Sequence, residues 1–313
     1  MTEPQQGLSY DEQLALARTA EDSGLEAFLR SDHYASFPGE LGLPTTDAWT
    51  TLAGLARETS TIRLGVLVSP VTFRLPGTLA KIIQTVDEMS DGRVEAGFGA
   101  GWNADEHAQL GLPFPEIGER FDRLEEQMAV IHGLWTEPDG WSYDGEHWQV
   151  RDSKRHGEIA RGGRRHPHIL FGGKGNARLA ALVARYGDEF NLNSASPDDV
   201  PAAYARVRAA CQAIGRDPDE VVYSAMTGVL VAETDTDLRV RVHDLLATIG
   251  QGGTDGDAWL AERRGRWIMG TPDDAMERVR ALEALGTQRV MLQDLLPRDL
   301  DHVRLIGRMF ARA

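Results

Sequence analysis

The residues best suited to proton transfer stand together where an apolar segment ends. The run "GLEAFL" is followed by Arg30, Ser31, Asp32, His33 and Tyr34. Histidine is the side chain whose charge changes nearest neutral pH, so His33 is a candidate acid or base, and the preceding Asp32 strengthens that interpretation. The alternatives are a solvated loop and a histidine that is simply held by hydrogen bonds. The choice depends on where this strand end lies in the fold.

Glycines and small polar residues follow the other apolar segments. The stretch "FGGKGN" places Gly172, Gly173 and Lys174 between a predicted strand and a predicted helix. Glycine lets the backbone approach a ligand closely, and amides at a helix start favour anions. The stretch therefore predicts a phosphate-side loop, with an ordinary tight turn as the alternative. Comparable strand ends read "LVSPVTFR", "GFGAGWNADEH", "FNLNSAS" and "LQDLLP".

Other signatures are incomplete. The stretch "GFGAGW" matches the dinucleotide pattern G-x-G-x-x-G poorly and lies in mid-chain. Glu106-His107 and the "HPH" at 166–168 do not complete a metal-ligand spacing such as H-E-x-x-H, which favours structural or surface roles, and no metal is expected. No G-x-S-x-G nucleophile motif is present. The single cysteine, Cys211, excludes an intramolecular disulfide and is expected to be buried or half-buried in a helix.

Composition narrows the functional classes. The chain has 313 residues, 42% of them hydrophobic, so it can bury a large core. Its net charge of −15 argues against nucleic-acid binding, which requires a basic face. No apolar run approaches the ~18 residues of a membrane span. The N-terminal "MTEPQQGLSYDEQ" is polar, unlike a signal peptide, so the expected location is the cytosol.

Apolar segments alternate with helical patterns along the chain. Such alternation predicts βα units and a parallel sheet. Seven clear strands and a doubtful one at the very start favour a (β/α)8 TIM-type barrel, with an open doubly wound sheet as the alternative. In both folds the active site lies at the carboxyl ends of the strands, where His33 stands. The seven segments are 25–30, 61–70, 93–101, 166–173, 188–193, 221–232 and 289–296.

Two insertions are expected within one domain that spans 1–313. Near 139–151, Asp144-Gly145 stands between aromatic-rich flanks, which predicts a β-hairpin. Near 250–267, the stretch "GQGGTDGDAWLAERRGRW" combines glycines and mixed charge without a sustained apolar period. Long non-regular loops tend to be lids, so a mobile lid is predicted there, with an ordinary surface insertion as the alternative.

Taken in order, these stretches resemble the luciferase-like monooxygenase superfamily of flavin and deazaflavin enzymes. The similarity is closest to the branch of coenzyme F420-dependent oxidoreductases, and it covers nearly all of the chain. It implies a TIM-type barrel with insertions, usually a homodimer, whose flavin or deazaflavin ring lies in the barrel mouth. The stretches that carry it are "EPQQGLSYDE", "AEDSGLEAFLRSDHY", "TSTIRLGVLVSPVTFRLPGTLAK", "TVDEMSDGRVEAGFGAGWNADEH", "ERFDRLEE", "HILFGGKGNARLAALVARYGDEFN" and "GTPDDAMERV".

The resemblance implies roles for particular residues. His33 matches the active-site histidine of an Asp-His motif, with Asp32 before it. Tyr34 and Trp102 are expected as walls of the substrate pocket. The family often has a non-prolyl cis peptide behind the ring, which implies one at Leu67–Val68. The cofactor-binding residues implied by position are Leu67, Val68, Ser69, Ala100, Gly101, Asn103, Leu170, Phe171, Gly172, Gly173 and Lys174.

Two departures from the family pattern stand out. F420-dependent sugar and alcohol dehydrogenases place an acidic residue where this chain has Trp102, so the resemblance does not supply their second proton-transfer group. Members usually begin with a full first strand before "PQ", whereas only Met1, Thr2 and Glu3 precede Pro4 here. The first strand is therefore expected to be curtailed.

The expected function is hydride transfer between coenzyme F420 and a small organic substrate, with His33 as acid or base. F420 is favoured over FMN by the family branch alone. The first alternative is an FMNH2-dependent monooxygenase. The second is a non-enzymatic flavin-binding barrel, against which Asp32-His33 and "FGGKG" argue. The sequence does not name the substrate.

Overall fold

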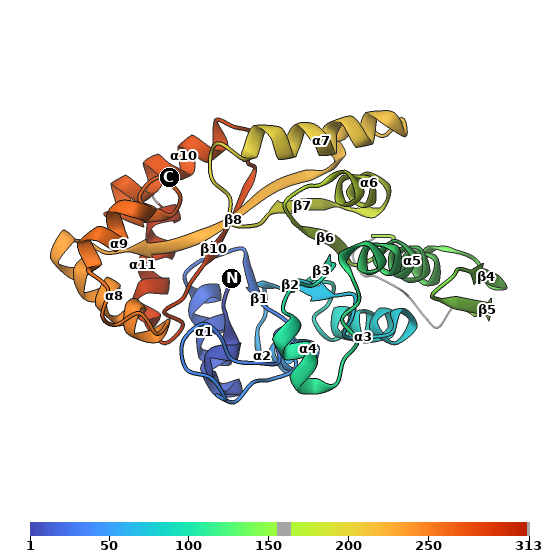
Figure 1. Cartoon of the computed structure of the whole chain (residues 1–313), viewed down its shortest axis with the longest axis horizontal. Coiled ribbons are helices and arrows are strands. Elements are labelled where there is room, and N and C mark those ends of the chain that lie inside the picture. The colour runs from blue at the N-terminus through green and yellow to red at the C-terminus, as the bar shows by residue number, and fades with distance from the viewer. Residues whose placement is uncertain (155–163, 312–313) are drawn as a thin grey trace.

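The chain forms a parallel sheet that curls into a barrel-like wall with helices along its outside (Figure 1). This computed structural model describes residues 1–154 and 164–311. The strands of the sheet pair in chain order, β1-β2-β3-β6-β7-β8-β10. A doubly wound sheet would reverse its strand order at a switch point. The predicted barrel-type architecture is therefore confirmed, and the open doubly wound alternative is wrong.

The sheet strands occupy the predicted segments. Hydrophobic residues dominate them, and β3 is buried along its whole length, as expected for a parallel sheet covered on both faces. Within the described residues, the short β9 beside β8 is an additional strand that the patterns did not predict. The strands are β1 (Ala27–Arg30), β2 (Arg63–Pro70), β3 (Val94–Gly99), β6 (His168–Gly173), β7 (Glu189–Leu192), β8 (Val222–Val231), β9 (Ile268–Gly270) and β10 (Arg289–Gln293).

The helices begin at polar caps that the sequence provides. Ser9 and Thr271 each form a capping box, and Asn176 accepts the backbone N–H of Leu179 at the start of the helix after β6. The helices are α1 (Tyr10–Asp22), α2 (Ala48–Glu58), α3 (Pro76–Met89), α4 (Ala104–Leu110), α5 (Ile117–Thr136), α6 (Ala177–Tyr186), α7 (Val200–Ala213), α8 (Asp235–Thr248), α9 (Gly256–Arg263), α10 (Pro272–Glu283) and α11 (Leu300–Ala311), with 3₁₀ turns at Pro4–Gln6 and Pro218–Glu220.

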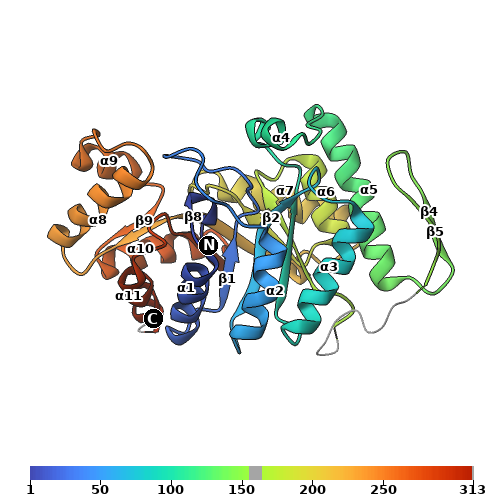
Figure 2. The ribbon, with the colours of Figure 1, turned by 90° about the horizontal axis from the view of Figure 1, so that it is seen from below.

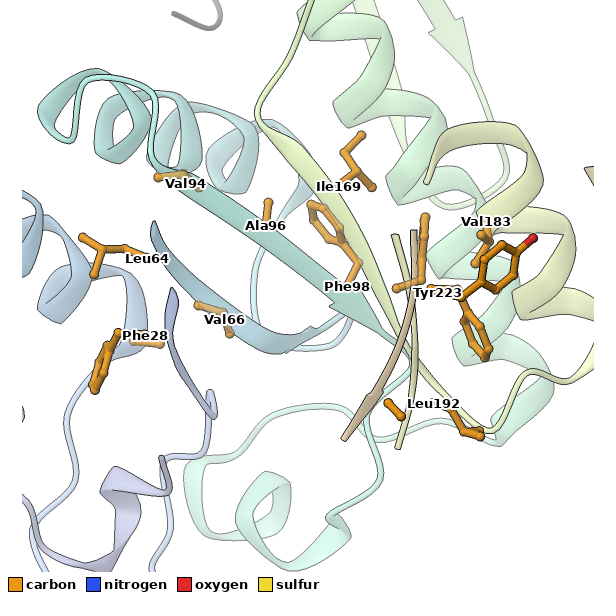
Figure 3. Close-up of a cluster of buried hydrophobic side chains, with 14 of the residues drawn as sticks. Phe28, Leu64, Val66, Val94, Ala96, Phe98, Ile169, Val183, Leu192 and Tyr223 are labelled. Carbon is orange, nitrogen blue, oxygen red and sulfur yellow. The ribbon is translucent and has the colours of Figure 1, made fainter. Parts of the chain in front are cut away.

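Side chains alternate between the two faces of the sheet. Leu170 belongs to an apolar cluster with Leu29 and Met291 on the inner face. The next residue, Phe171, joins the larger cluster between sheet and helices, where its ring lies 6.2 Å from that of Phe98. Burying a large apolar side chain stabilises the fold by about 1.5–3 kcal/mol. Figure 3 shows residues of this outer layer, among them Val66 on β2, Ile169 on β6 and Val183 on α6.

The two ends of the sheet are joined by Met1 and Thr2. Thr2 forms parallel bridges to Arg30, the last residue of β1, and to Asp294, just after β10. The Thr2 N–H donates to the Leu29 carbonyl at 2.9 Å, and the Met1 amino group donates to the Leu292 carbonyl at 3.0 Å. In the described residues, the doubtful strand at the start takes the form of this bridge.

The predicted hairpin is confirmed. Strands β4 (Trp141–Asp144) and β5 (Gln149–Ser153) pair antiparallel and lie outside the barrel, beside α5 (Figure 2). The Glu126 carboxylate on α5 accepts the backbone N–H groups of Glu146, His147 and Trp148. These bonds hold the hairpin turn against the helix.

The predicted non-regular character of 250–267 is wrong. Helix α9 occupies its centre, and the Asp255 side chain caps it by accepting the Ala258 N–H. Trp259 and Leu260 are buried against α8. These two adjacent residues hold the helix in place, although the segment has no repeating pattern of apolar residues. At its start, a methyl group added to Gly250 would lie 3.0 Å from Cα of Gly39, in the loop that follows His33. The segment therefore borders the barrel mouth, and its mobility stays a prediction.

Two further sequence expectations concern single residues and metals. Cys211 is fully buried in α7, as predicted. Among the described residues, no three histidine, cysteine, aspartate or glutamate side chains are grouped to hold a metal ion. In the same part of the chain, no helix combines the length and the apolar character needed to cross a bilayer.

Candidate active site

His33 is paired with a buried glutamate from a different part of the chain. Its Nδ1 lies 2.8 Å from Oε1 of Glu106, whose side chain is 2% exposed. The other carboxylate oxygen accepts the backbone N–H of Tyr34 at 3.0 Å. One carboxylate therefore fixes both the imidazole ring and the backbone that follows it.

This pairing determines which histidine nitrogen is available. A carboxylate only accepts hydrogen bonds, so its partner Nδ1 carries the hydrogen. In the neutral ring Nε2 is then the acceptor. No group among the described residues hydrogen-bonds Nε2 of His33, and the side chain is 18% exposed. The ring can therefore take a proton at Nε2 while Glu106 supports the resulting charge.

Local sequence places Glu106 at this point. Gly101 has a φ of 76°, which turns the chain after β3, and the Asn103 side chain then caps α4 by accepting the N–H groups of Asp105 and Glu106. The neighbouring His107 is committed elsewhere, because Nε2 lies 2.6 Å from Thr72 Oγ1 and Nδ1 lies 2.6 Å from the Asn103 carbonyl. The structural role predicted for His107 is thus confirmed, whereas Glu106 belongs to the candidate site.

Aromatic rings surround His33. Phe37 and Trp102 both meet the imidazole edge-on, with ring centroids 4.5 Å and 5.6 Å away. The two rings also contact each other at 5.3 Å. Trp102 is 66% exposed although it is a large apolar residue. An exposed aromatic beside a candidate base suits the predicted pocket wall.

Asp32 does not hydrogen-bond His33, although the two are adjacent in sequence. Its carboxylate is 1% exposed and accepts Nη1 and Nη2 of Arg74 at 2.5 and 2.9 Å. It also accepts the Ser69 hydroxyl at 2.8 Å, and that hydroxyl accepts the Trp49 indole N–H. Burial raises the pKa of Asp32, while Arg74 and Ser69 act to lower it. The buried Asp32 carboxylate thus faces away from His33, and its charge is balanced by Arg74.

Tyr34 belongs to the same network. Its hydroxyl donates to Asp47 at 2.6 Å and accepts from Arg74 at 2.6 Å, and its ring stacks on Phe73. Burial and the nearby Asp32 raise the pKa of this hydroxyl, so it remains a neutral donor. Burial would also raise the pKa of Asp47, but hydrogen bonds and the Arg74 charge hold it well below its usual value. Tyr34 therefore supports the site while its hydroxyl is already engaged.

The β2 bulge has the predicted irregular backbone. The peptide between Leu67 and Val68 is cis, and the β2–β3 register shifts between Val66 and Ser69. Glycines on the adjoining strands leave room for Val68. A methyl group added at Gly99 would lie 2.6 Å from its Cγ2, and one added at Gly172 would lie 2.8 Å from its Cγ1. The predicted segments of β2, β3 and β6 thus meet around one side chain.

The loop after β6 lies at the same end of the sheet as His33, because β1 and β6 are parallel strands of one sheet. Lys174 is exposed and donates to the carbonyls of Asn193 and Ser194, at 2.7 and 3.3 Å. It thereby ties the β6–α6 loop to the chain after β7. Leu170 faces the barrel interior, whereas the Phe171 side chain lies in the outer core, away from any ligand inside the barrel.

The remaining predicted residues divide into two groups. Ala100 and Gly101 follow β3 directly beside the β2 bulge, so their backbone belongs to the same rim. Asn103 uses its side-chain oxygen as a helix cap. Sequence reasoning missed Glu106, Arg74, Asp47 and Phe37. Two of them could have been found by their position just after a predicted strand. Arg74 ends "LVSPVTFR", and Glu106 lies in "GWNADEH".

The chain matches the profile of luciferase-like monooxygenases over residues 1–289. It belongs to the luciferase-like monooxygenase family. The curled parallel sheet and the strand-end site at His33 agree with that membership. The predicted resemblance is thereby confirmed at the level of the family.

Relatives differ in the reaction that their names give. An F420-dependent glucose-6-phosphate dehydrogenase from Amycolatopsis mediterranei is 32% identical, over 56% of this chain and 51% of its own. The pyrimidine monooxygenase RutA from Stutzerimonas stutzeri is 28% identical, over 83% of this chain and 71% of its own. The matches span 51% to 64% of the lengths of the first curated relatives.

A solved structure shares the fold. An F420-dependent secondary alcohol dehydrogenase in complex with an F420-acetone adduct superposes with a TM-score of 0.79 at 17% identity, covering 97% of this chain and 94% of that one. At this identity the likeness concerns the fold. It places the described strands in the arrangement of a luciferase-like barrel.

Proposed function

We propose that the protein is a deazaflavin-dependent oxidoreductase that transfers a hydride between coenzyme F420 and a small organic substrate. The observation that carries the proposal is the His33–Glu106 pair. It fixes one ring nitrogen and leaves Nε2 beside an exposed aromatic wall. The F420-dependent relatives support the choice of cofactor.

The residues at this rim fit a flat, anionic cofactor. Gly99 and Gly172 leave room for the Val68 side chain, which lets the β2 bulge stand at this rim. The Asn193 Oδ1 atom is buried without a hydrogen-bond partner among the residues that the structure describes, so a donor from a ligand can satisfy it. We assign the ring side to Leu67–Ser69, Ala100 and Gly101, and the phosphate side to Gly172, Gly173 and Lys174. When bound, F420 supplies the hydride acceptor or donor.

Side chains of this protein can transfer the proton that accompanies hydride transfer. Nε2 of His33 accepts a proton from a substrate hydroxyl during oxidation, or returns it during reduction. Glu106 orients the imidazole and stabilises its charged form. Trp102 and Phe37 reduce the access of water to the ring. Asp32 serves as a positioning residue, because its carboxylate is fully engaged by Arg74 and Ser69.

Anaerobic titration distinguishes the cofactors. The purified protein is mixed with F420 and, separately, with FMN, and binding is followed by fluorescence. The expected result is tight binding of F420 and no oxygen uptake in the presence of reduced cofactor. Tight binding of FMN alone, together with substrate-dependent oxygen uptake, would contradict the proposal.

Lys174 tests the phosphate side separately. With a net charge of −15, the protein repels an anionic cofactor at long range, so local cations have to compensate. Lys174→Ala is expected to weaken F420 binding by about 1–3 kcal/mol, the scale of a charge-assisted hydrogen bond. The difference shrinks at high salt, because Lys174 is exposed. Equal dissociation constants for both proteins would leave the backbone amides as the phosphate ligands.

The second candidate is an FMNH2-dependent monooxygenase. Trp102 favours it, because an apolar ring stands where the F420-dependent sugar and alcohol dehydrogenases carry an acid. The monooxygenase relatives support it as well. We further propose a homodimer located in the cytosol, in which residues 1–313 form one domain. Light scattering of the purified protein tests the dimer.

A further inference from the structure

Two basic side chains meet at the loop that follows β6. Lys174 belongs to the loop itself, whereas Arg206 comes from α7 and donates from Nε to the Gly175 carbonyl at 2.7 Å. Both side chains are exposed. Within residues 1–154 and 164–311, each of them bonds backbone carbonyl groups and forms no ion pair. The positive charge of both therefore remains available to an anion.

Close packing fixes Arg206 at this place. Gly175 is buried, and a methyl group added to it would lie 2.9 Å from Cζ of Phe190 and 3.4 Å from Cβ of Ala203 on α7. Arg206 follows Ala203 by three positions, so it lies on the same face of the helix. Its Nε is occupied by the Gly175 carbonyl, while Nη1 and Nη2 have no acceptor in the described part of the chain. The planar guanidinium matches the geometry of a carboxylate.

The surroundings suit an anion that leaves the barrel at this rim. Helices α6 and α7 pack against each other on the outside of the sheet (Figure 1). The first turn of α6 carries no acidic residue. Arg178 on α6 and Arg208 on α7 are each paired with an aspartate, at 2.7 Å. Lys174 and Arg206 differ from these two arginines, because no carboxylate among the described residues offsets their charge.

We propose that Arg206 binds a carboxylate in the glutamate tail of coenzyme F420. The proposal rests on the function proposed above, in which the phosphate side of the cofactor lies at Gly172, Gly173 and Lys174. The tail follows the phosphodiester in the cofactor, and Arg206 contacts the residue that follows Lys174 in the chain. FMN ends at its phosphate, so Arg206 is a residue that distinguishes the two cofactors.

The net charge of the protein determines what would be expected without this contact. At −15 the protein repels each added carboxylate at long range, so a longer tail would weaken binding. A contact with Arg206 reverses this trend, because an exposed ion pair strengthens binding by up to about fivefold. The sign of the dependence on tail length therefore tests the assignment.

The experiment compares two forms of the cofactor, one with two glutamates and one that ends before the first glutamate. Binding is measured by F420 fluorescence. Wild-type protein is expected to bind the diglutamyl form about threefold more tightly at low salt, and this preference should shrink at high salt. Arg206→Gln should lose the preference and keep its affinity for the tail-free form within about twofold. Arg206→Lys should retain part of the preference, since it keeps the charge.

Arg208→Gln is the matched control. It removes the same charge from the same helix, but Arg208 is paired with Asp219, so the wild-type preference should remain. Equal affinity of the wild type for the two forms, or an unchanged preference in Arg206→Gln, would overturn the assignment. An equal loss of affinity for both forms in Arg206→Gln would also overturn it, because Arg206 would then act through the loop.

The same titrations separate this assignment from the function on which it rests. Equal affinities for the two forms of F420 would overturn the role of Arg206 and leave F420 as the cofactor. Tight binding of FMN without binding of either form of F420 would contradict both the proposed function and the role of Arg206.

Discussion

Nδ1 of His33 and Oε1 of Glu106 lie 2.8 Å apart, although 73 positions separate the two residues in the chain. The pair joins the end of β1 to the first turn of α4. We expect Glu106→Gln to release the fixed tautomer, because an amide can either donate or accept. ¹⁵N NMR of the labelled imidazole should show Nδ1–H in the wild type and a mixture in the variant. A single unchanged tautomer in both proteins would contradict this role.

His33→Asn tests the same pair through activity. General acid–base catalysis contributes about 10²–10⁴-fold, so turnover of an accepted substrate should fall on that scale. Binding of the cofactor should remain within about threefold, because His33 is assigned to the proton and not to the phosphate or the ring. An equal loss of binding and turnover would make His33 a binding residue.

Arg74 holds a buried carboxylate, so its removal should be costly. Arg74→Met leaves Asp32 buried without its cation, and breaking such a pair costs about 3–5 kcal/mol. Urea unfolding measures the free energy. The double variant Arg74→Met/Asp32→Asn should recover part of the loss, since the charge is gone. Arg151→Met, in an exposed pair with Asp144, serves as the control and should change stability by less than about 1 kcal/mol.

Two glycines differ in the space around them. Gly99→Ala places a methyl group 2.6 Å from Val68 Cγ2, so overpacking should cost about 1–3 kcal/mol. Adding Val68→Ala should recover stability by removing the clashing methyls. Gly77→Ala lies in α3, where the nearest atom is 4.0 Å away, and should stabilise by about 0.5–1 kcal/mol. Equal thermal shifts for the two single variants would refute the packing argument.

Glu21 ties the end of α1 to the start of β2. Burial acts to raise its pKa, but hydrogen bonds from the backbone of Thr61, Ile62 and Ser60 lower it from 4.5 to about 2. A depressed folded-state pKa contributes stability above the unfolded value, and that stability is lost as the pH falls toward the folded value. Glu21→Gln should therefore cost about 1–3 kcal/mol at pH 7.

The pH dependence supplies the check. The difference in unfolding free energy between wild type and Glu21→Gln should shrink steadily as the pH falls from 4.5 to about 2. Denaturant titrations at pH 7, 4 and 3 measure it. A difference that stays constant over this range would assign the effect to packing.

Strand segments, and their order around the barrel, could be predicted from sequence because apolar runs and their glycine ends are local signals. The cis peptide at Leu67–Val68 was predicted from family resemblance and is confirmed. The partners of His33 and Asp32 could not be predicted in this way. Glu106 and Arg74 reach them from beyond the ends of β3 and β2, and the pairing of these strands beside β1 brings those ends together. Adjacency in sequence pointed to Asp32 as the partner of His33, whereas its carboxylate bonds Arg74 and Ser69.

Helix α9 was not predicted, because its sequence lacks a periodic apolar pattern. Trp259 and Leu260 are adjacent residues, so they do not produce the repeat that identifies an amphipathic helix. Their burial against α8 depends on tertiary packing. A short helix with two anchors and a good cap at Asp255 is stable here without a long periodic pattern.

The bridge at Thr2 has a consequence for the order of folding. It joins residues near positions 30 and 294, so the ring cannot close until β10 has been made. Contacts between such distant segments form late, because the entropy of closing the intervening chain opposes them. During synthesis the early strands β1 to β3 can pair with one another. The other side of β1 stays unpaired until β10 has been made. The seam between β1 and β10 is thus the last part of the sheet to form, and the part where premature association with another chain is easiest.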